Sequence, residues 1–178
     1  MKTRLTRRLA LLVLGITLLP LQALEIRLDD FVGIRWGASS DEAKVIMKSA
    51  KGLDIIPAST SATMLYFEGS TFDLWRAKRW NLWFVDDQFY SGRVMVLPAG
   101  KRDRAFAEVK KALTAKYGIP ADSEHKGWPS CRWHLKATLS DKSEKEILLT
   151  DNPKEEGPRI QYSNLSMKMP ETPTGDDL

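Results

Sequence analysis

The chain has 178 residues, with 27 Lys and Arg against 23 Asp and Glu and a single cysteine. Four basic residues lie within the first 23 residues, which hold no acidic residue, so 23 basic and 23 acidic side chains remain in the rest of the chain. This balance excludes a broad basic surface for nucleic acid, and one cysteine excludes an intramolecular disulfide.

Residues 1–23 have the pattern of a secretory signal peptide. A basic patch of Lys2, Arg4, Arg7 and Arg8 precedes the apolar run 9–19, and Ala23 ends the segment after Pro20. The apolar run is short for a bilayer core of about 30 Å. We therefore predict a periplasmic or secreted protein with no transmembrane anchor after cleavage.

Two segments have the spacing of amphipathic helices. The first begins with a capping-box pattern at Ser39 and Glu42 and ends at Gly52, and the second runs from Asp103 to Tyr117 before Gly118. The apolar stripes are Ala43, Ile46, Met47 and Ala50 in the first, and Phe106, Val109, Leu113 and Tyr117 in the second.

Six segments read as strands, three after each helix. These are Thr60–Phe67, Arg79–Val85, Phe89–Leu97, Cys131–Thr138, Lys145–Thr150 and Arg159–Ser163. The segment Thr71–Lys78 fits either a strand or a loop. Phe89 is out of phase with Val94 and Val96, so we predict a β-bulge near Gly92 that brings all three onto one face.

The order helix, three strands, helix, three strands predicts an α+β fold. Because strands joined by short turns pair antiparallel, we expect tandem helix-plus-three-strand units that form an antiparallel sheet with helices packed on one face. The predicted domain covers residues 24–165, with pseudo-repeat halves 31–97 and 98–165. Residues 166–178 offer little to bury and are predicted to be a disordered tail.

Two short motifs carry a resemblance to known proteins. Residues 33–37 (GIRWG), with Ser39 and Ser40 and an acidic residue after them, and residues 116–120 (KYGIP) resemble two boxes of small exported bacterial envelope proteins of unknown function. The helix entry is also similar to that of envelope-assembly lipoproteins and tandem-repeat β-lactamase-inhibitor-like domains. The resemblance implies an antiparallel sheet carrying helices, and it transfers no catalytic residue. The chain lacks the lipid-bearing cysteine of those lipoproteins.

The search for chemistry yields no metal site, cofactor motif or nucleophile motif. Cys131 and His134 are the best candidate metal pair, but residues three apart on a strand face opposite sides. The only other histidine is His125, and neither histidine lies in a recognisable catalytic box. We therefore expect a protein that is not an enzyme; the alternative is a hydrolase built on His125 or His134 with an unrecognised site.

Aromatic and basic residues gather just before the predicted hairpin. The candidate binding residues are Trp75, Arg76, Lys78, Arg79 and Trp80. Aromatic faces beside cations suit stacking and anion contacts, although the same pattern also fits core aromatics beside a charged strand edge. We expect a binding or assembly module of the cell envelope that engages an envelope protein or glycan and no nucleic acid. The alternative is an inhibitor of a secreted or periplasmic hydrolase that uses an exposed loop over Ser123–Ser130.

Overall fold

A computed structural model describes residues 28–97, 99–100, 102–125, 127–136 and 142–167. The predicted signal peptide, and the predicted tail from residue 168 onward, lie outside these residues. None of the helices in the described part of the chain has the length and apolar character needed to cross a membrane.

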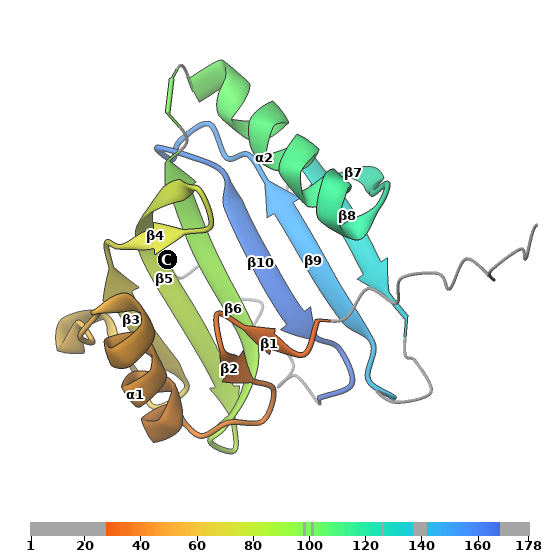
Figure 1. Cartoon of the computed structure of the whole chain (residues 1–178). Helices are drawn as coiled ribbons and strands as arrows, with labels where there is room; N and C mark the ends of the chain where they lie inside the picture. The colour runs from red at the N-terminus through yellow and green to blue at the C-terminus, as the bar shows by residue number, and fades with distance from the viewer. Residues whose placement is uncertain (1–27, 98, 101, 126, 137–141, 168–178) are drawn as a thin grey trace, which may run out of the picture.

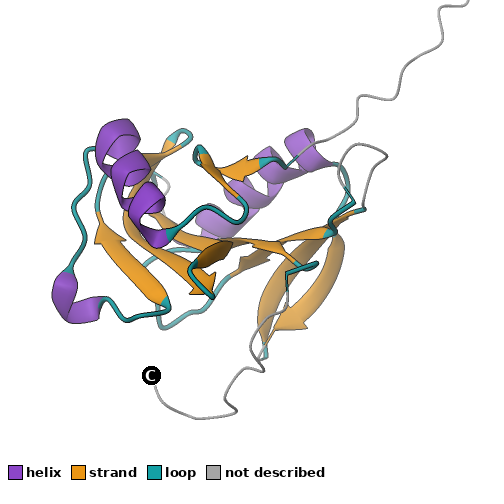
Figure 2. Ribbon diagram, turned by 90° about the horizontal axis from the view of Figure 1, so that it is seen from below, coloured by secondary structure: helices purple, strands orange, loops and turns teal. Residues whose placement is uncertain are grey.

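The centre of the molecule is one antiparallel sheet of eight strands, which confirms a mixed α+β fold that is mainly β (Figure 1). Seven strands lie side by side, β4 pairs with β5, and the strands twist relative to one another (Figure 2). The order across the sheet is β3 (Met64–Glu68), β5 (Trp75–Val85), β6 (Gln88–Leu97), β10 (Arg159–Asn164), β9 (Lys145–Thr150), β8 (Trp128–Leu135) and β7 (Ala121–His125), with β4 at Thr71–Phe72.

The remaining elements are two helices, a small hairpin and one 3-10 turn. They are β1 (Asp30–Phe31), β2 (Ile34–Arg35), α1 (Ser40–Lys51), η1 (Pro57–Ser59) and α2 (Arg102–Tyr117). The predicted capping box at Ser39 and Glu42 is present, and Gly52 ends α1 in the left-handed conformation. Both helices bury the expected faces except at Ala50, which is exposed because α1 turns only Ala43 and Met47 fully into the core.

The long hairpin of β5 and β6 contains the predicted bulge. Asp86 and Asp87 form its two-residue turn with φ values of 49° and 57°. The register shifts between Trp83 and Phe84, so Tyr90 is the extra residue and Phe89 returns to the face of Val94. The bulge is thus confirmed, but two residues before Gly92.

Gly92 has a different role from the predicted one. The ring of Phe31 packs directly over it, so an added Cβ would lie 2.3 Å from Cδ1 of Phe31. The glycine therefore makes room for the β1–β2 hairpin on the sheet.

Several predicted strand bounds are wrong. β3 begins at Met64 rather than Thr60, because Ser61 and Met64 close a turn through two backbone hydrogen bonds of 2.9 and 3.4 Å. β8 begins at Trp128 rather than Cys131, and β7 has no counterpart among the predicted strands because its sequence ADSEH is polar. The undecided segment 71–78 forms β4, a tight turn and the start of β5.

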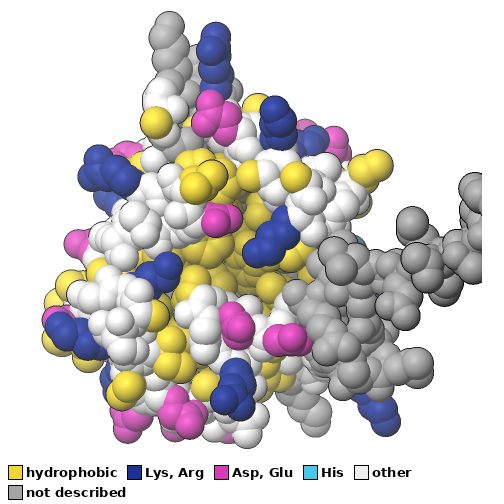
Figure 3. Space-filling model, viewed as in Figure 1, with side chains coloured by type: hydrophobic (Ala, Val, Ile, Leu, Met, Phe, Trp, Pro, Cys, Tyr) yellow, Lys and Arg dark blue, Asp and Glu magenta, His cyan; other side chains and the backbone are white. Residues whose placement is uncertain are grey.

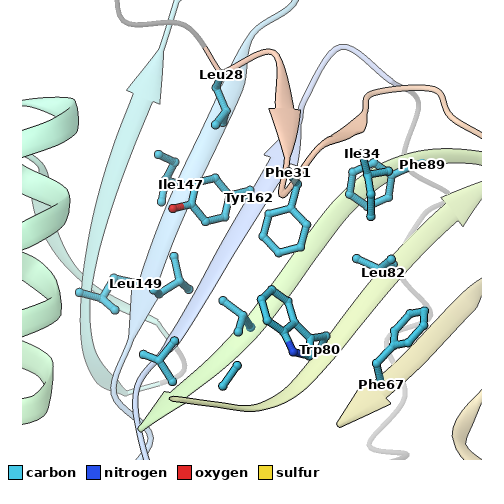
Figure 4. Close-up of a cluster of buried hydrophobic side chains, with 14 of the residues drawn as sticks. Leu28, Phe31, Ile34, Phe67, Trp80, Leu82, Phe89, Ile147, Leu149 and Tyr162 are labelled. Atoms are coloured by element: carbon cyan, nitrogen blue, oxygen red, sulfur yellow. The ribbon is translucent and has the colours of Figure 1, made fainter. Parts of the chain in front are cut away.

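The core covers one face of the sheet (Figure 4). Alternate residues of every long strand point into it, among them Trp80, Leu82, Val94 and Ile160. The indole of Trp80 is completely buried and its Nε1 donates to the carbonyl oxygen of Gly69 at 2.9 Å. The residues between these core residues on each strand point to the opposite face of the sheet, which is here called the polar face.

Candidate functional site

The structure separates the five binding residues predicted from the sequence. Trp80 lies in the core, and the ring of Trp75 is partly buried against the core. Arg76 is exposed, and Lys78 forms an ion pair with Glu156. Only Arg79 lies among the central residues of the polar face.

Strand register assembles the polar face from residues far apart in the sequence. Asn81 of β5 pairs with Arg93 of β6, and Arg93 pairs with Gln161 of β10. In the next row, Met95 lies between Arg79 and Arg159. We define the arginine cluster as Arg79, Arg93 and Arg159, which occupy three adjacent strands.

Arg93 is the central and most desolvated member of the arginine cluster. Its guanidinium lies 4.6 Å from the ring centroid of Trp83, and its Nε and Nη2 donate to Oε1 of Gln161 at 3.1 and 2.7 Å. The pKa of Arg93 is lowered to about 10, mainly by burial and in smaller part by the positive charges of Arg159 and Arg79. Among the described residues, no carboxylate lies within 4 Å of this guanidinium.

Glu155 is the counter-ion of the other two arginines. Arg159 holds its carboxylate with both arms of the guanidinium, Nε donating at 2.7 Å, and Nη2 of Arg79 lies 3.5 Å away. The Glu155 side chain is only 11% exposed. Nε of Arg79 is buried without a hydrogen-bond partner in the described structure. Two of the three guanidinium groups thus share one carboxylate, and Arg93 does not contact it.

Aromatic side chains border the arginine cluster. Tyr66 donates a hydrogen bond to Oε1 of Glu68 at 2.8 Å, and the pKa of Tyr66 is raised by burial and by that carboxylate. The pKa of Tyr90 is raised by burial, while the nearby charge of Arg93 opposes the rise. Trp83 completes the group beneath Arg93. Partly buried aromatic rings beside arginines are typical of binding surfaces.

The other end of the polar face carries the residues considered for metal or hydrolase chemistry. His134 is exposed, with Nε2 3.8 Å from Oε2 of Glu146. Nε of Arg132 forms an ion pair with the same oxygen at 3.3 Å, although this contact does not have the geometry of a hydrogen bond. Cys131 is buried on the core side, where burial raises its pKa to about 11. The described residues contain no group of three metal-ligating side chains.

The segment expected to form an inhibitory loop is a hairpin. Ser123–Ser130 spans the end of β7 and the start of β8, and the hydroxyls of Ser123 and Ser130 lie 2.8 Å apart. Hydrolase inhibition through this hairpin stays a prediction, as does the alternative of a hydrolase built on one of the two histidines.

A cleft of about 380 Å³ opens on the core side, and apolar side chains line the hollow visible in Figure 3. Its walls include Asp30, Asp73 and Lys116. Phe31 and Tyr162 in its lining are only 2% and 4% exposed, so these two residues belong mainly to the hydrophobic core. A second cleft lies against α1, and neither cleft includes the arginine cluster.

Sequence reasoning missed most of the arginine cluster. Arg93 and Arg159 stand alone in their strands, so no local run of cations marks them. The available signal was the two-residue period, since Arg93 alternates with Val94, and Arg159 with Ile160. Bringing the residues together required the strand order, which places β6 beside β10.

Comparison with known proteins adds no assignment, because no protein-family model, curated protein or solved structure matches this chain.

Proposed function

We propose that this protein is an exported, non-enzymatic binding or assembly module of the cell envelope that binds a protein partner through its polar face. The observation that carries the proposal is Arg93, a largely buried cation beside two further arginines with no carboxylate near it among the described residues. Burying such a charge costs stability, so its presence favours a functional role.

The composition of the polar face supports a protein partner. Trp83 and Tyr90 lie beside Arg93, and Tyr66 lies near Arg79. Tryptophan, tyrosine and arginine are enriched in protein interfaces and dominate their binding energy. A glycan of the envelope is the second class of ligand that aromatic residues beside arginines fit.

The compartment is inferred from the sequence. The basic, apolar and small-residue regions of residues 1–23 support export to the periplasm or beyond. A buried Cys131 with a raised pKa suits an oxidising compartment, because its thiol is poorly reactive.

We further infer that the two halves of the sheet are tandem units, 31–97 and 98–165, with their helices packed on one face. The order β3-β5-β6 is followed across the sheet by β10-β9-β8, which is the order expected when two similar three-strand units meet at their last strands. Met47 of α1 and Val109 of α2 belong to the same core cluster, which supports a shared helical layer. In this scheme β7 is an addition to the second unit.

Site-specific crosslinking tests the binding proposal. A photoreactive benzoylphenylalanine replaces Tyr66 on the polar face or, as the control position, exposed Lys111 on α2. We expect a discrete crosslinked envelope protein from position 66 only, and we expect Arg93→Met to remove it. Arg104→Met removes an exposed arginine elsewhere and should leave the crosslink unchanged. Equal crosslinking from both positions, or a product that survives Arg93→Met, would contradict the proposal.

A further inference from the structure

Glu155 has the position of a ligand as well as that of a structural counter-ion. It comes from the segment between β9 and β10, where its backbone N–H donates to the carbonyl oxygen of Asn152 at 2.9 Å. This turn presents the carboxylate to Arg159, which binds it with two arms, while Arg79 lies 3.5 Å away. Fork-to-carboxylate pairing is the strongest way in which arginine recognises an anion. The cluster therefore accepts a planar carboxylate in its present geometry.

The carboxylate of Glu155 does not provide a partner for every guanidinium group of the arginine cluster. Nε of Arg79 is buried without a hydrogen-bond partner among the described residues, and Arg93 has a neutral partner, Gln161, in place of an anion. The two neighbouring guanidinium groups also lower the pKa of Arg93 through their charge. A second carboxylate placed against Arg93 would supply the anion that this guanidinium lacks and would relieve the repulsion among the three positive charges.

We propose that the arginine cluster is a carboxylate-binding site for an acidic segment of the protein partner, and that Glu155 competes with that segment for the arginines. The inference rests on the proposed function. An acidic protein segment fits because its carboxylates match the cluster in charge and shape, while Trp83 and Tyr90 provide apolar area for the residues that flank them.

The test measures binding of a fluorescently labelled hexaglutamate peptide by anisotropy at low salt. Removing the competing charge with Glu155→Gln should tighten binding by about tenfold, and Arg93→Met should weaken it by about tenfold or more. Glu155→Asp, which keeps the charge but shortens the side chain, should give an intermediate affinity. Arg104→Met, with the same charge change as Arg93→Met, should shift affinity by no more than about twofold. Urea unfolding verifies that each variant is folded.

Three results would overturn this inference. None of them would decide whether the polar face binds a protein, which the crosslinking experiment tests separately. The first is unchanged affinity in both Glu155 variants. The second is displacement of the peptide by inorganic phosphate at lower concentration than by free glutamate, which would make the site one for phosphate. The third is that Glu171→Gln with Asp176→Asn and Asp177→Asn, and not Glu155→Gln, tightens binding, which would make the chain's own acidic terminus the competitor.

Discussion

Two tryptophans of β5, three residues apart, lie in opposite environments. Trp80 meets Phe31 and Phe72 edge to face at centroid distances of 6.1 and 5.7 Å and is fully buried. Trp83 lies partly exposed beneath the guanidinium of Arg93. Because successive strand residues alternate between faces, this odd separation decides that one ring stabilises the core and the other borders the polar face.

The contrast extends to how polar groups are satisfied on the two faces. On the core side, the indole N–H groups of Trp80 and Trp133 each reach a backbone carbonyl, at 2.9 and 2.8 Å. On the polar side, Nε of Arg79 is buried without a hydrogen bond in the described structure, and Nε of Arg132 has only an ion-pair contact, 3.3 Å from Oε2 of Glu146. Local imbalance of this kind is expected where a surface is shaped by binding rather than by stability.

The largest expected effect separates the two tryptophans. Trp80→Ala should lower the free energy of unfolding by about 4 kcal/mol, because it empties a fully buried site and leaves Gly69 without its donor. Trp83→Ala should cost about 1 kcal/mol, since its ring is partly exposed and mainly supports Arg93. Urea unfolding measures both, and equal losses would show that the two faces do not differ in this way.

Arg159 should matter more for stability than its neighbours on the polar face. Arg159→Met removes the main counter-ion of Glu155, whose side chain is 11% exposed, and leaves it only Arg79 at 3.5 Å; the change should cost about 2 kcal/mol. The double variant with Glu155→Leu removes both charges and should recover most of the loss. A double variant as unstable as Arg159→Met would mean that the arginine acts through packing instead.

The sequence is sufficient to predict the helices and the long hairpin. Caps at Ser39 and Gly52 define the ends of α1 through local hydrogen bonds, and such bonds depend on near neighbours alone. The bulge is predictable because Phe89 and Val94 must share the core face. The short strands are not, since β4 and β7 hold few apolar residues and exist because a neighbouring strand pairs with them.

The arginine cluster is predictable only in part from the sequence. The density of aromatic and basic residues around Trp80 points to β5, and Arg79 does lie in the cluster. Density along the chain does not distinguish faces, however, so it groups Trp80 with neighbours that point the other way. Arg159 joins Arg79 because β10 lies next to β6, a contact between residues about 70 positions apart that no local pattern encodes.

Gly92 allows a test of the close packing on the core face of the sheet. Gly92→Ala places a methyl group 2.3 Å from the Phe31 ring and should cost about 2 kcal/mol, because the β1–β2 hairpin must lift from the sheet. In a background of Phe31→Ala the same change should cost less than about 0.5 kcal/mol, since the obstructing ring is gone. Thermal and urea unfolding of the four proteins measure the difference. A penalty that persists without Phe31 would indicate a backbone requirement at Gly92.

Arg93→Met provides the smallest and most diagnostic change, with an expected gain in stability of about 1 kcal/mol at pH 7. The pKa of Arg93 is lowered to about 10 in the folded protein, so its charged form opposes folding. This cost is fully present below pH 10 and fades as the pH rises from 10 toward the ordinary value of 12.5. The stability advantage of Arg93→Met over the native chain should therefore shrink between pH 7 and about pH 10.5.

Urea unfolding midpoints at both pH values test this prediction for Arg93→Met. The control variant Arg104→Met is expected to stay within about 0.5 kcal/mol of the native chain. A variant less stable than the native chain at pH 7 would show that Gln161 and Trp83 compensate the buried charge. Arg93 would then have no stability cost, and its burial would no longer favour a binding role.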